Sequence, residues 1–510
     1  MPPEAHYNSG MDSLLEEEPA PRRRFQKRWL WWAFLAWWAA VALWNVSKPM
    51  PPGTDVSSPL ITAAASDVQF LYDLTTALPD GKAVREQRIF DEVFDIIDQA
   101  QSFVIADFFL LNDMMGAADG VYRPLSRQLA DRLLARKAAN PALNILLITD
   151  PINDVYGGMP SPLLNELRAA GIEVVSTNLD RLRDSNAIYS ALWRMFLQWW
   201  GNSPDGGSMM NPFAPPGSPP ITFRSWLALA NFKANHRKVI LADRADGTLT
   251  GMVTSANPHD GSSSHSNVGL RFNGALAQEI VNSERAVARF SGWRGQLYAP
   301  APIPPATEPA DPVQLQFLTE EAIRDHLVGA IDTTRNGDAV SIATFYLSDR
   351  KIVKSLLNSA SRGAKVRLIL DPNKDAFGRE KDGVPNRPVA SELVRRSDEK
   401  IQVRWYRTHG EQFHTKLALV THGDRLIASL GSANLTRRNI GNYNLEANVA
   451  VELSAASPLG IELISYFDRL WNNDGPPGTS FTAGFGAWKD DDTGRYWRYR
   501  LMEATGLSTF

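Results

Sequence analysis

The chain has 510 residues, of which 44% are hydrophobic and 21% charged, and its formal net charge is −3. A chain of this length is expected to hold two or three domains, and its apolar content excludes a mainly disordered protein. The near-neutral charge gives no support to a dedicated duplex nucleic-acid binder, which usually presents a strongly basic face. There is no cysteine, so disulfides, thiolate nucleophiles and cysteine-ligated zinc are excluded.

The N-terminus predicts a membrane anchor. Residues 29–46 carry no charge, and at 1.5 Å per residue they reach about 27 Å, enough to cross a bilayer core. Five basic residues precede this stretch and only Lys48 closely follows it, so the positive-inside rule places the N-terminus in the cytoplasm. The alternatives are a secretion signal cleaved near Ala40-Val41-Ala42 and a buried core helix. We expect a basic tail at 1–28, an anchor at 29–46 and a linker at 47–64.

The rest of the chain repeats one plan weakly. In each half, apolar and β-branched runs that end in Asp-Pro predict buried strands followed by turns, and residues 89–100 have the spacing of an amphipathic helix. Strands that alternate with helices predict an α/β layered fold. The runs lie at 68–73, 102–113 and 144–151, and again at 313–318, 339–349 and 365–372. We therefore expect a first half at 65–298, a Pro-rich linker at 299–312, a second half at 313–475 and a C-terminal extension at 476–510.

An aromatic-rich stretch interrupts the first half. Residues 188–200 read IYSALWRMFLQWW, and a loop rich in Pro and Gly follows at 202–220. The favoured interpretation is a core helix under a long loop. The alternative is a flap that faces the membrane or covers the substrate, because long loops in compact domains are often lids.

Two similar motifs carry the chemistry. The first has His236, Lys238 and Asp243, followed by Thr-Ser-Ala-Asn at 254–257. The second has His414, Lys416 and Asp424, followed by Gly-Ser-Ala-Asn at 431–434. In an alternating strand the His and the Lys of each motif point to the same face.

Two such faces together meet the needs of phosphodiester cleavage without a metal. One imidazole attacks phosphorus and the other protonates the leaving oxygen, and the ordinary pKa of histidine lies near neutrality. Lysine and asparagine side chains can hold the non-bridging oxygens, whose charge grows in the transition state. No spacing suggests a zinc site, and no cofactor is expected.

The duplicated H-x-K-(x)4-D pattern with a downstream G-S-x-N resembles the phospholipase D superfamily, which includes cardiolipin synthases, phospholipases D and certain nucleases. The resemblance covers most of residues 65–475. It implies two similar α/β/α sandwich halves that form one active site. The anchor predicted at 29–46 adds an N-terminal transmembrane helix to this fold. It also implies a phosphohistidine intermediate, with His236 as nucleophile and His414 as acid and base. The other residues it implies are Lys238, Lys416, Asn257 and Asn434 in catalysis, and Asp243, Asp424, Ser255 and Ser432 in support.

The sequence departs from this pattern in both copies. Thr421 stands where the second motif should have Asp, which we interpret as a hairpin insertion that displaces the aspartate to Asp424. Family members often carry an acidic residue that orients a catalytic histidine, and Glu446 fits that role in the second copy. The matching place in the first copy is Gly269, so the expected substitutes are Asp260 or Asn267. We expect solvated loop positions for His259, His265 and His422, and a solvated capping helix at 495–500.

The favoured function is a phosphodiesterase or phosphatidyltransferase that acts on phospholipids, anchored in the bacterial inner membrane with its catalytic domain in the periplasm. The alternative is a membrane-tethered nuclease of the same superfamily that acts outside the cytoplasm. An inactive scaffold is the third hypothesis, and the presence of both complete His-Lys-Asn sets argues against it.

Overall fold

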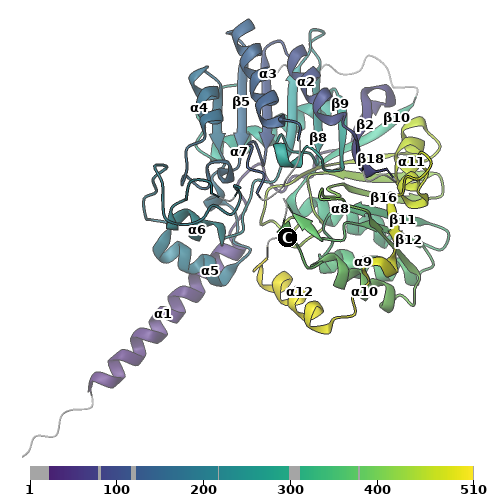
Figure 1. Cartoon of the computed structure of the whole chain (residues 1–510). Coiled ribbons are helices and arrows are strands. Elements are labelled where there is room, and N and C mark those ends of the chain that lie inside the picture. Colours follow the sequence, from purple (N-terminus) through teal and green to yellow (C-terminus); the bar gives the residue numbers. More distant parts are fainter. Residues whose placement is uncertain are drawn as a thin grey trace, which may run out of the picture.

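The structure is a computed structural model that describes residues 22–78, 82–116, 122–215, 217–297, 311–376, 379–508 and 510. Most of the expected basic tail (1–21) and of the expected Pro-rich linker (299–310) therefore lies outside the described residues. Two large sheets, one in each half of the chain, carry the fold (Figure 1).

The first sheet has eight strands in the order β3-β2-β9-β8-β7-β4-β5-β6. Its apolar outer face is covered by α2 (Ile89–Gln99), α3 (Leu125–Ala139) and α4 (Pro162–Ala169). The strands are β2 (Val68–Ala77), β3 (Ala83–Glu86), β4 (Phe103–Phe108), β5 (Asn144–Thr149), β6 (Glu173–Ser176), β7 (Lys238–Asp243), β8 (Leu249–Thr254) and β9 (Asn267–Asn273). The predicted strands at 68–73, 102–113 and 144–151 and the predicted helix at 89–100 are all present.

The second sheet has nine strands in the order β1-β10-β18-β17-β16-β11-β12-β15-β19. The expected linker contributes β1 to it, and the expected C-terminal extension contributes β19. The strands are β1 (Ile61–Ala64), β10 (Pro312–Thr319), β11 (Ala339–Thr344), β12 (Lys365–Leu370), β15 (Ile401–Tyr406), β16 (Lys416–His422), β17 (Arg425–Gly431), β18 (Ala447–Ser454) and β19 (Thr482–Gly484). Its outer helices are α8 (Glu320–Asp332), α9 (Arg350–Ser361), α10 (Asn386–Arg396) and α12 (Thr493–Thr505), and β13 (Asp375–Ala376) pairs with β14 (Arg379–Glu380) in a separate hairpin.

Two helices lie between the sheets and join the halves. Helix α7 (Ala275–Phe290) contacts β8 and β9 of the first sheet and β10 of the second, while α11 (Pro458–Asn472) contacts β2 and β19. One apolar core therefore runs through both halves. Each sheet has helices on both faces, which confirms the predicted pair of α/β/α halves.

The N-terminal helix α1 (Arg22–Ser47) projects from the body (Figure 1). Its segment Arg28–Ser47 is long and apolar enough to cross a membrane, with a mean hydropathy of 1.3. Its C-terminal half packs against α5 (Ala187–Leu192) and against the π-helical turn η4 (Trp193–Leu197). The favoured interpretation of residues 188–200 as a core helix is wrong, because Ile188 is 53% and Trp199 76% exposed.

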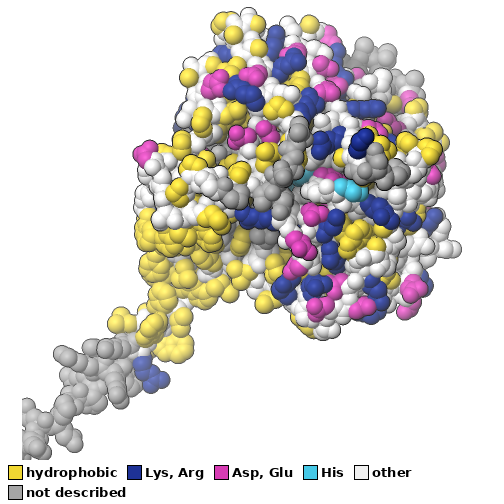
Figure 2. Space-filling view, viewed as in Figure 1, with side chains coloured by type: hydrophobic (Ala, Val, Ile, Leu, Met, Phe, Trp, Pro, Cys, Tyr) yellow, Lys and Arg dark blue, Asp and Glu magenta, His cyan; other side chains and the backbone are white. Residues whose placement is uncertain are grey.

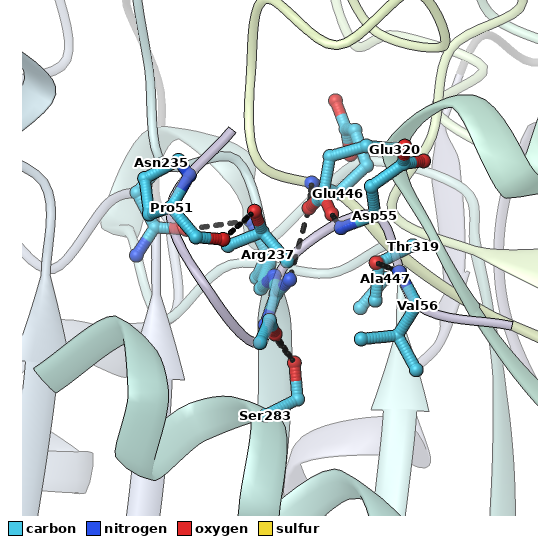
Figure 3. A network of polar contacts seen from close by, with 12 residues as sticks. Pro51, Asp55, Val56, Asn235, Arg237, Ser283, Thr319, Glu320, Glu446 and Ala447 are labelled. Atoms are coloured by element: carbon cyan, nitrogen blue, oxygen red, sulfur yellow. Dashed lines mark hydrogen bonds and ion pairs between the residues drawn. The ribbon is translucent and has the colours of Figure 1, made fainter. Parts of the chain in front are cut away.

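The segment after α1 is strapped to both halves. At Gly53 the backbone runs directly against Ala286 of α7, and the Ser283 hydroxyl of the same helix donates to the Gly53 carbonyl at 3.0 Å. Two residues later the Asp55 amide donates to the Glu320 carboxylate of the second half at 2.6 Å (Figure 3). Helix α1 is therefore joined to the body by an ordered segment.

A buried cation completes this junction. Arg237, which is fully buried, donates to Glu284 at 3.1 Å and to Glu320 at 2.9 Å, and Figure 3 shows its guanidinium between the elements of the two halves. Glu320 also accepts the backbone amide of Glu446 at 3.0 Å. Because a buried charge is costly unless it is paired, this cluster fixes the two halves relative to each other.

We expect Gly53→Ala to destabilise the protein. Gly53 has φ +84°, and a Cβ atom there would lie 2.3 Å from the Ala286 Cβ. A left-handed conformation and overpacking together cost about 2–4 kcal/mol, so the thermal unfolding midpoint of the detergent-solubilised protein should fall. The matched control is Gly329→Ala in α8, where an added Cβ meets nothing within 4 Å and stability should stay equal or rise by up to ~1 kcal/mol. Equal midpoints for Gly53→Ala and the wild type would contradict the strap.

Candidate active site

The two motifs meet at the junction of the halves. His236 and His414 each lie two residues before a central strand, β7 or β16. Their imidazole rings have centroids 6.4 Å apart, at an interplanar angle of 75°. Both residues are 8% exposed. The fold thus brings residues that are far apart in the sequence into one site, as the duplicated motif predicted.

The Asp-Pro turns position the segments that carry the histidines. The carboxylate of Asp150, at the end of β5, accepts the backbone amide of Asn235 at 2.7 Å. In the same place of the second half, Asp371 accepts the amide of Phe413 at 2.8 Å. Burial raises the pKa of each of these two carboxyl groups to about 7. The repeated Asp-Pro signal therefore marks residues that hold the histidine segments.

Each histidine segment is also bonded to the opposite half. The amide of His236 donates to the Leu445 carbonyl at 2.8 Å, and Ser266 donates to the Gln412 carbonyl at 3.1 Å. Isolated parallel bridges join Asn235 to Leu445 and Ser266 to Phe413. The segment that leads into β18 or β9 of one half therefore runs beside the histidine of the other half.

This arrangement exchanges the histidine partners between the copies. The Glu446 carboxylate of the second copy lies 2.8 and 3.0 Å from Nδ1 of His236, the histidine of the first copy. The Asn267 amide oxygen of the first copy lies 3.1 Å from Nδ1 of His414. Our expectation that Glu446 serves the histidine of its own copy is therefore wrong.

Backbone register identifies Asn267 as the counterpart of Glu446. The amide of Ser255 donates to the Val268 carbonyl at 2.8 Å, and in the second half Ser432 donates to the Ala447 carbonyl at 2.9 Å. Asn267 and Glu446 each directly precede these two acceptors. The assignment of Gly269 as the matching position is wrong by two residues, because it rested on counting from the asparagines and the intervening loops differ in length.

The motif serines hold these two partners. Ser255 Oγ donates to the Asn267 amide oxygen at 3.0 Å, and Ser432 Oγ donates to the Glu446 carboxylate. The Asn439 amide also donates to Glu446, which is fully buried. Because the oxygens that face the histidines are fixed by further hydrogen bonds, the imidazole tautomers are fixed too.

Each motif lysine lies over an aromatic ring. Lys238 Nζ donates to the His236 carbonyl at 2.6 Å and lies 5.3 Å from the ring centroid of Phe109. Lys416 donates to the His414 carbonyl at 2.7 Å and lies 5.4 Å from the ring centroid of Phe345. The sequence analysis missed these two phenylalanines. The signal that could have found them is their equal place in the repeats, directly after β4 and β11.

Burial and crowding of cations control protonation. Burial and the two lysines hold the pKa of His236 well below its usual value, and burial and Lys416 do the same for His414. Burial lowers the pKa of Lys238 to about 7 and that of Lys416 well below its usual value. Burial raises the pKa of Glu446 to about 7. At neutral pH both imidazoles are therefore neutral, while Lys238 and Glu446 have pKa values close to the ambient pH.

The motif asparagines differ in their hydrogen bonds. The Asn257 side-chain oxygen accepts a hydrogen bond from the backbone amide of Leu110 at 3.2 Å. The NH₂ group of Asn257 therefore points away from Leu110. Within the described part of the chain, the buried side-chain oxygen of Asn434 has no hydrogen-bond partner.

A further cation, Arg438, adds to the site and was missed by the sequence analysis. Its charge is one cause of the lowered pKa of His236, and it donates to the Ser508 carbonyl at 2.9 Å. Its place four residues after Asn434, on the turn that follows the motif, is the signal that could have found it.

The two motif aspartates are not equivalent. Asp243 accepts the amides of Ser102 and Phe103 at 2.9 and 3.1 Å and so ties β7 to the start of β4. Asp424 lies in the tight turn between β16 and β17, where the Ser454 hydroxyl donates to it at 2.8 Å. In register, Thr421 occupies the place of Asp243. The expected insertion is wrong, because the β16–β17 turn is shorter than the β7–β8 turn.

The remaining histidines are less exposed than expected. His259 and His265 are buried, so the expectation of solvated loop positions is wrong for both. His259 Nε2 lies 2.8 Å from the Met114 carbonyl, and the His265 ring centroid lies 5.7 Å from that of His414. His422 is half-buried on β16 and contacts Asp338 at 2.9 Å. Of the three, His265 lies next to the catalytic histidine candidates.

Comparisons with known proteins found one matching family model and several similar solved structures. Residues 327–471 match the family model described as "Cardiolipin synthase, PLD-like domain". Among solved structures, the chain is similar to phosphatidylserine synthase from Haemophilus influenzae Rd KW20, with a TM-score of 0.56 and 10% identity over 91% of this chain and 99% of that chain. It also matches Nuc, a phospholipase D family member from Salmonella typhimurium, with a TM-score of 0.25 and 18% identity over 31% of this chain and 95% of that chain. A comparison with curated proteins found no match.

At 10% identity, the likeness to the phosphatidylserine synthase concerns the fold, and it extends over nearly the whole of both chains. The family match lies in the second half and includes His414, Lys416 and Asn434. The first half repeats its strands and its motif in the same order. Residues 327–471 therefore match a cardiolipin synthase, PLD-like domain, and the chain as a whole shares the fold of that phosphatidylserine synthase.

Proposed function

We propose that the protein is a membrane-anchored enzyme that cleaves or exchanges the head-group phosphodiester of phospholipids through a phosphohistidine intermediate. The observation that carries the proposal is the pair His236 and His414, 6.4 Å apart between ring centroids, each with its Nδ1 bonded to an oxygen of the opposite half. The match of residues 327–471 to the cardiolipin synthase family model supports a phospholipid substrate.

The unequal partners support His236 as the nucleophile. A carboxylate at Nδ1 accepts that proton and leaves the lone pair on Nε2. Attack on phosphorus makes the imidazole cationic, and the Glu446 carboxylate at 2.8 Å stabilises this charge. The neutral Asn267 amide stabilises a cation at His414 less, so a protonated His414 is the stronger acid.

In the first step, the Nε2 lone pair of His236 forms the bond to phosphorus. The bond from phosphorus to the leaving alcohol oxygen breaks, and that oxygen takes the Nε2 proton of His414. In the second step His414 removes a proton from water or an acceptor alcohol, whose oxygen attacks phosphorus and releases His236. Lys238 and Lys416 stabilise the non-bridging oxygens in both steps.

The lowered pKa values of the lysines and of His414 fit a site in which these groups become protonated when the substrate binds. An anionic phosphodiester between the lysines favours their protonated forms and that of His414, because opposite charges in a buried site interact strongly. Substrate binding therefore promotes uptake of a proton from solvent by His414, which then passes it to the leaving alcohol oxygen. The same effect disfavours a neutral ligand, which offers the lysines no compensation for burial.

The apolar segment Arg28–Ser47 supports a single membrane span. We propose that its N-terminus faces the cytoplasm and that the catalytic halves lie on the periplasmic side of a bacterial inner membrane, as the charge bias around the span predicts.

We expect the reconstituted protein to turn over phosphatidylglycerol or phosphatidylcholine in vesicles. His236→Ala and His414→Ala should each lower the rate by about 10³-fold or more, because each removes a bond-making or proton-transferring group. The matched control is His422→Ala on β16, where the ring contacts Asp338 and the rate should be unchanged. Release of head group and formation of phosphatidyl-alcohol are measured with and without an added alcohol.

Single-stranded DNA is the competing substrate in the same assay. Cleavage of DNA without turnover of either lipid would reject the phospholipid function and favour the nuclease. Lipid turnover that survives in both His236→Ala and His414→Ala would reject the active-site assignment.

We expect the pH dependence of kcat/KM to show the ionisation of Glu446. Its pKa of about 7 means that the negative charge facing His236 is lost as pH falls through 7, so kcat/KM should decrease on that side. Glu446→Gln should remove this limb and lower kcat/KM by about 10²–10⁴-fold, the scale seen when a histidine loses its carboxylate. A Glu446→Gln profile that keeps the wild-type acid limb would contradict this role.

Asn267→Asp tests the other histidine with a substitution of nearly equal size. A carboxylate at 3.1 Å from Nδ1 should raise the pKa of His414. Because the general acid must be protonated, the alkaline limb of kcat/KM should move to higher pH while the acid limb assigned to Glu446 stays. An alkaline limb that moves to lower pH would exclude His414 as the acid.

Topology can be tested on the cysteine-free chain. Ile461→Cys on α11, where the native side chain is 53% exposed, should react with a membrane-impermeant maleimide in cells whose outer membrane alone has been permeabilised. Reaction only after lysis of the inner membrane would reverse the proposed orientation.

A further inference from the structure

The base of the first half carries an unusually apolar exposed surface. It is made by α5, by η4, by α6 (Phe223–Leu229) and by the loop between them. Figure 2 shows hydrophobic side chains gathered there, continuous with the upper part of α1. We name this the apolar platform and define it by the exposed residues Ile188, Leu192, Phe196, Trp199, Trp200, Met210, Phe223 and Trp226. Soluble surfaces seldom expose contiguous apolar patches of this kind unless they bind something.

The platform lies beside α1 and not merely near its end. The Trp38 indole donates to the Ile188 carbonyl at 3.2 Å. Further along, the Phe196 ring stacks on Phe34 at 6.4 Å and meets Trp37 edge-on at 6.0 Å. Since α1 rises 1.5 Å per residue, Trp38 lies about 14 Å and Phe34 about 20 Å from the Ser47 end.

These contacts decide what surrounds the platform once α1 spans a membrane. The hydrocarbon core is about 30 Å thick, so Trp38 and Phe34 lie deep within it. Helix α5 and η4 touch α1 at this depth and must share it. Ile188, Leu192 and Phe196 follow each other at four-residue intervals, so they form one helical face. The part of this face that α1 leaves exposed would meet lipid at this depth.

Two cationic side chains near the platform pair with a buried carboxylate. Arg194, on η4, donates to the Asp184 carboxylate at 2.9 Å, and Lys233 forms an ion pair with the same carboxylate. The side chains of Asp184 and Lys233 are 1% and 5% exposed. This pairing leaves the lipid side to aromatic and aliphatic groups, and no unpaired charge from this cluster enters the hydrocarbon.

The same cluster couples the platform to the chemistry. Lys233 lies three residues before His236 and donates to the carbonyls of Leu179 and Leu182 at 3.3 and 3.2 Å. The Ser190 hydroxyl of α5 donates to the Asn231 side chain at 2.9 Å. The segment from α6 to His236 is thus held directly above the platform.

We propose that the apolar platform is inserted into the hydrocarbon core of the membrane from the side that carries the catalytic halves, where it holds the active site against the membrane that supplies its phospholipid substrate. The inference rests on the proposed span of α1 and adds a second, independent contact with the same bilayer. It assigns to the exposed residues of the apolar platform the role of a lipid-embedded base, and the lipid is the bulk phospholipid of that membrane.

The experiment uses the absence of native cysteine. Single cysteines are introduced into the full-length chain by Ile188→Cys and Trp199→Cys on the platform, Leu35→Cys on α1 and Ile461→Cys on α11. Ile188 and Ile461 are matched, because both are isoleucines with a side chain that is 53% exposed. Each variant carries an environment-sensitive fluorophore and is reconstituted in nanodiscs of phosphatidylglycerol and phosphatidylcholine.

Lipids with brominated acyl chains and aqueous iodide serve as the two quenchers. We expect labels at 35, 188 and 199 to lose most of their fluorescence to brominated lipid and little to iodide, and the label at 461 to show the reverse. Iodide quenching at 188 and 199 with lipid quenching at 35 would overturn the platform and leave the anchor intact. Iodide quenching at 35 as well would overturn the anchor, and with it the platform.

Discussion

The candidate active site depends on one constraint: each motif histidine takes its hydrogen-bond partner from the opposite half. His236 reaches Glu446 and His414 reaches Asn267 because the segment that carries each histidine is hydrogen-bonded to the segment that precedes β18 or β9 of the other half. One half alone would present an imidazole without its acceptor. The buried ion pairs of Arg237 with Glu284 and Glu320 fix the two halves relative to each other and so stabilise this exchange of partners.

The exchange of partners also makes the surroundings of the two histidines unequal. Two copies of one motif would give two equivalent histidines, but the partners are a carboxylate in one case and an amide in the other. A carboxylate stabilises a cationic phosphohistidine, whereas an amide leaves the facing imidazolium more acidic. In the mechanism that we propose, a single difference between otherwise parallel positions therefore separates the role of nucleophile from that of acid.

The same junction determines how the site is placed relative to α1. The strap at Gly53 and Asp55 is bonded to α7 and to Glu320, and Glu320 in turn binds the amide of Glu446. Helix α1 is thus connected through a few ordered residues to the partner of His236. With the contacts of α1 on α5 and η4, this gives the helix two attachments to the body.

The sequence by itself determined the parts that depend on local pattern. Alternating apolar runs predicted the strands around β4, β5, β11 and β12, and the repeated His-x-Lys and Ser-Ala-Asn predicted two equal contributions to one site. An uncharged stretch of 18 residues predicted the helix that became α1. These features could be predicted because side-chain periodicity and motif spacing are set within a few residues of the chain.

Only the tertiary structure decided which residues face one another. Counting along the chain placed the counterpart of Glu446 at Gly269, but strand register places it at Asn267, since loops of different length shift the count without shifting the hydrogen bonds. Similarly, the apolar residues at 188–200 looked like core, and their contact with α1 turned one face outward. The hydrophobicity of a side chain indicates only that it avoids water. Whether the side chain packs in a protein core or contacts a bilayer depends on the elements that pack beside it.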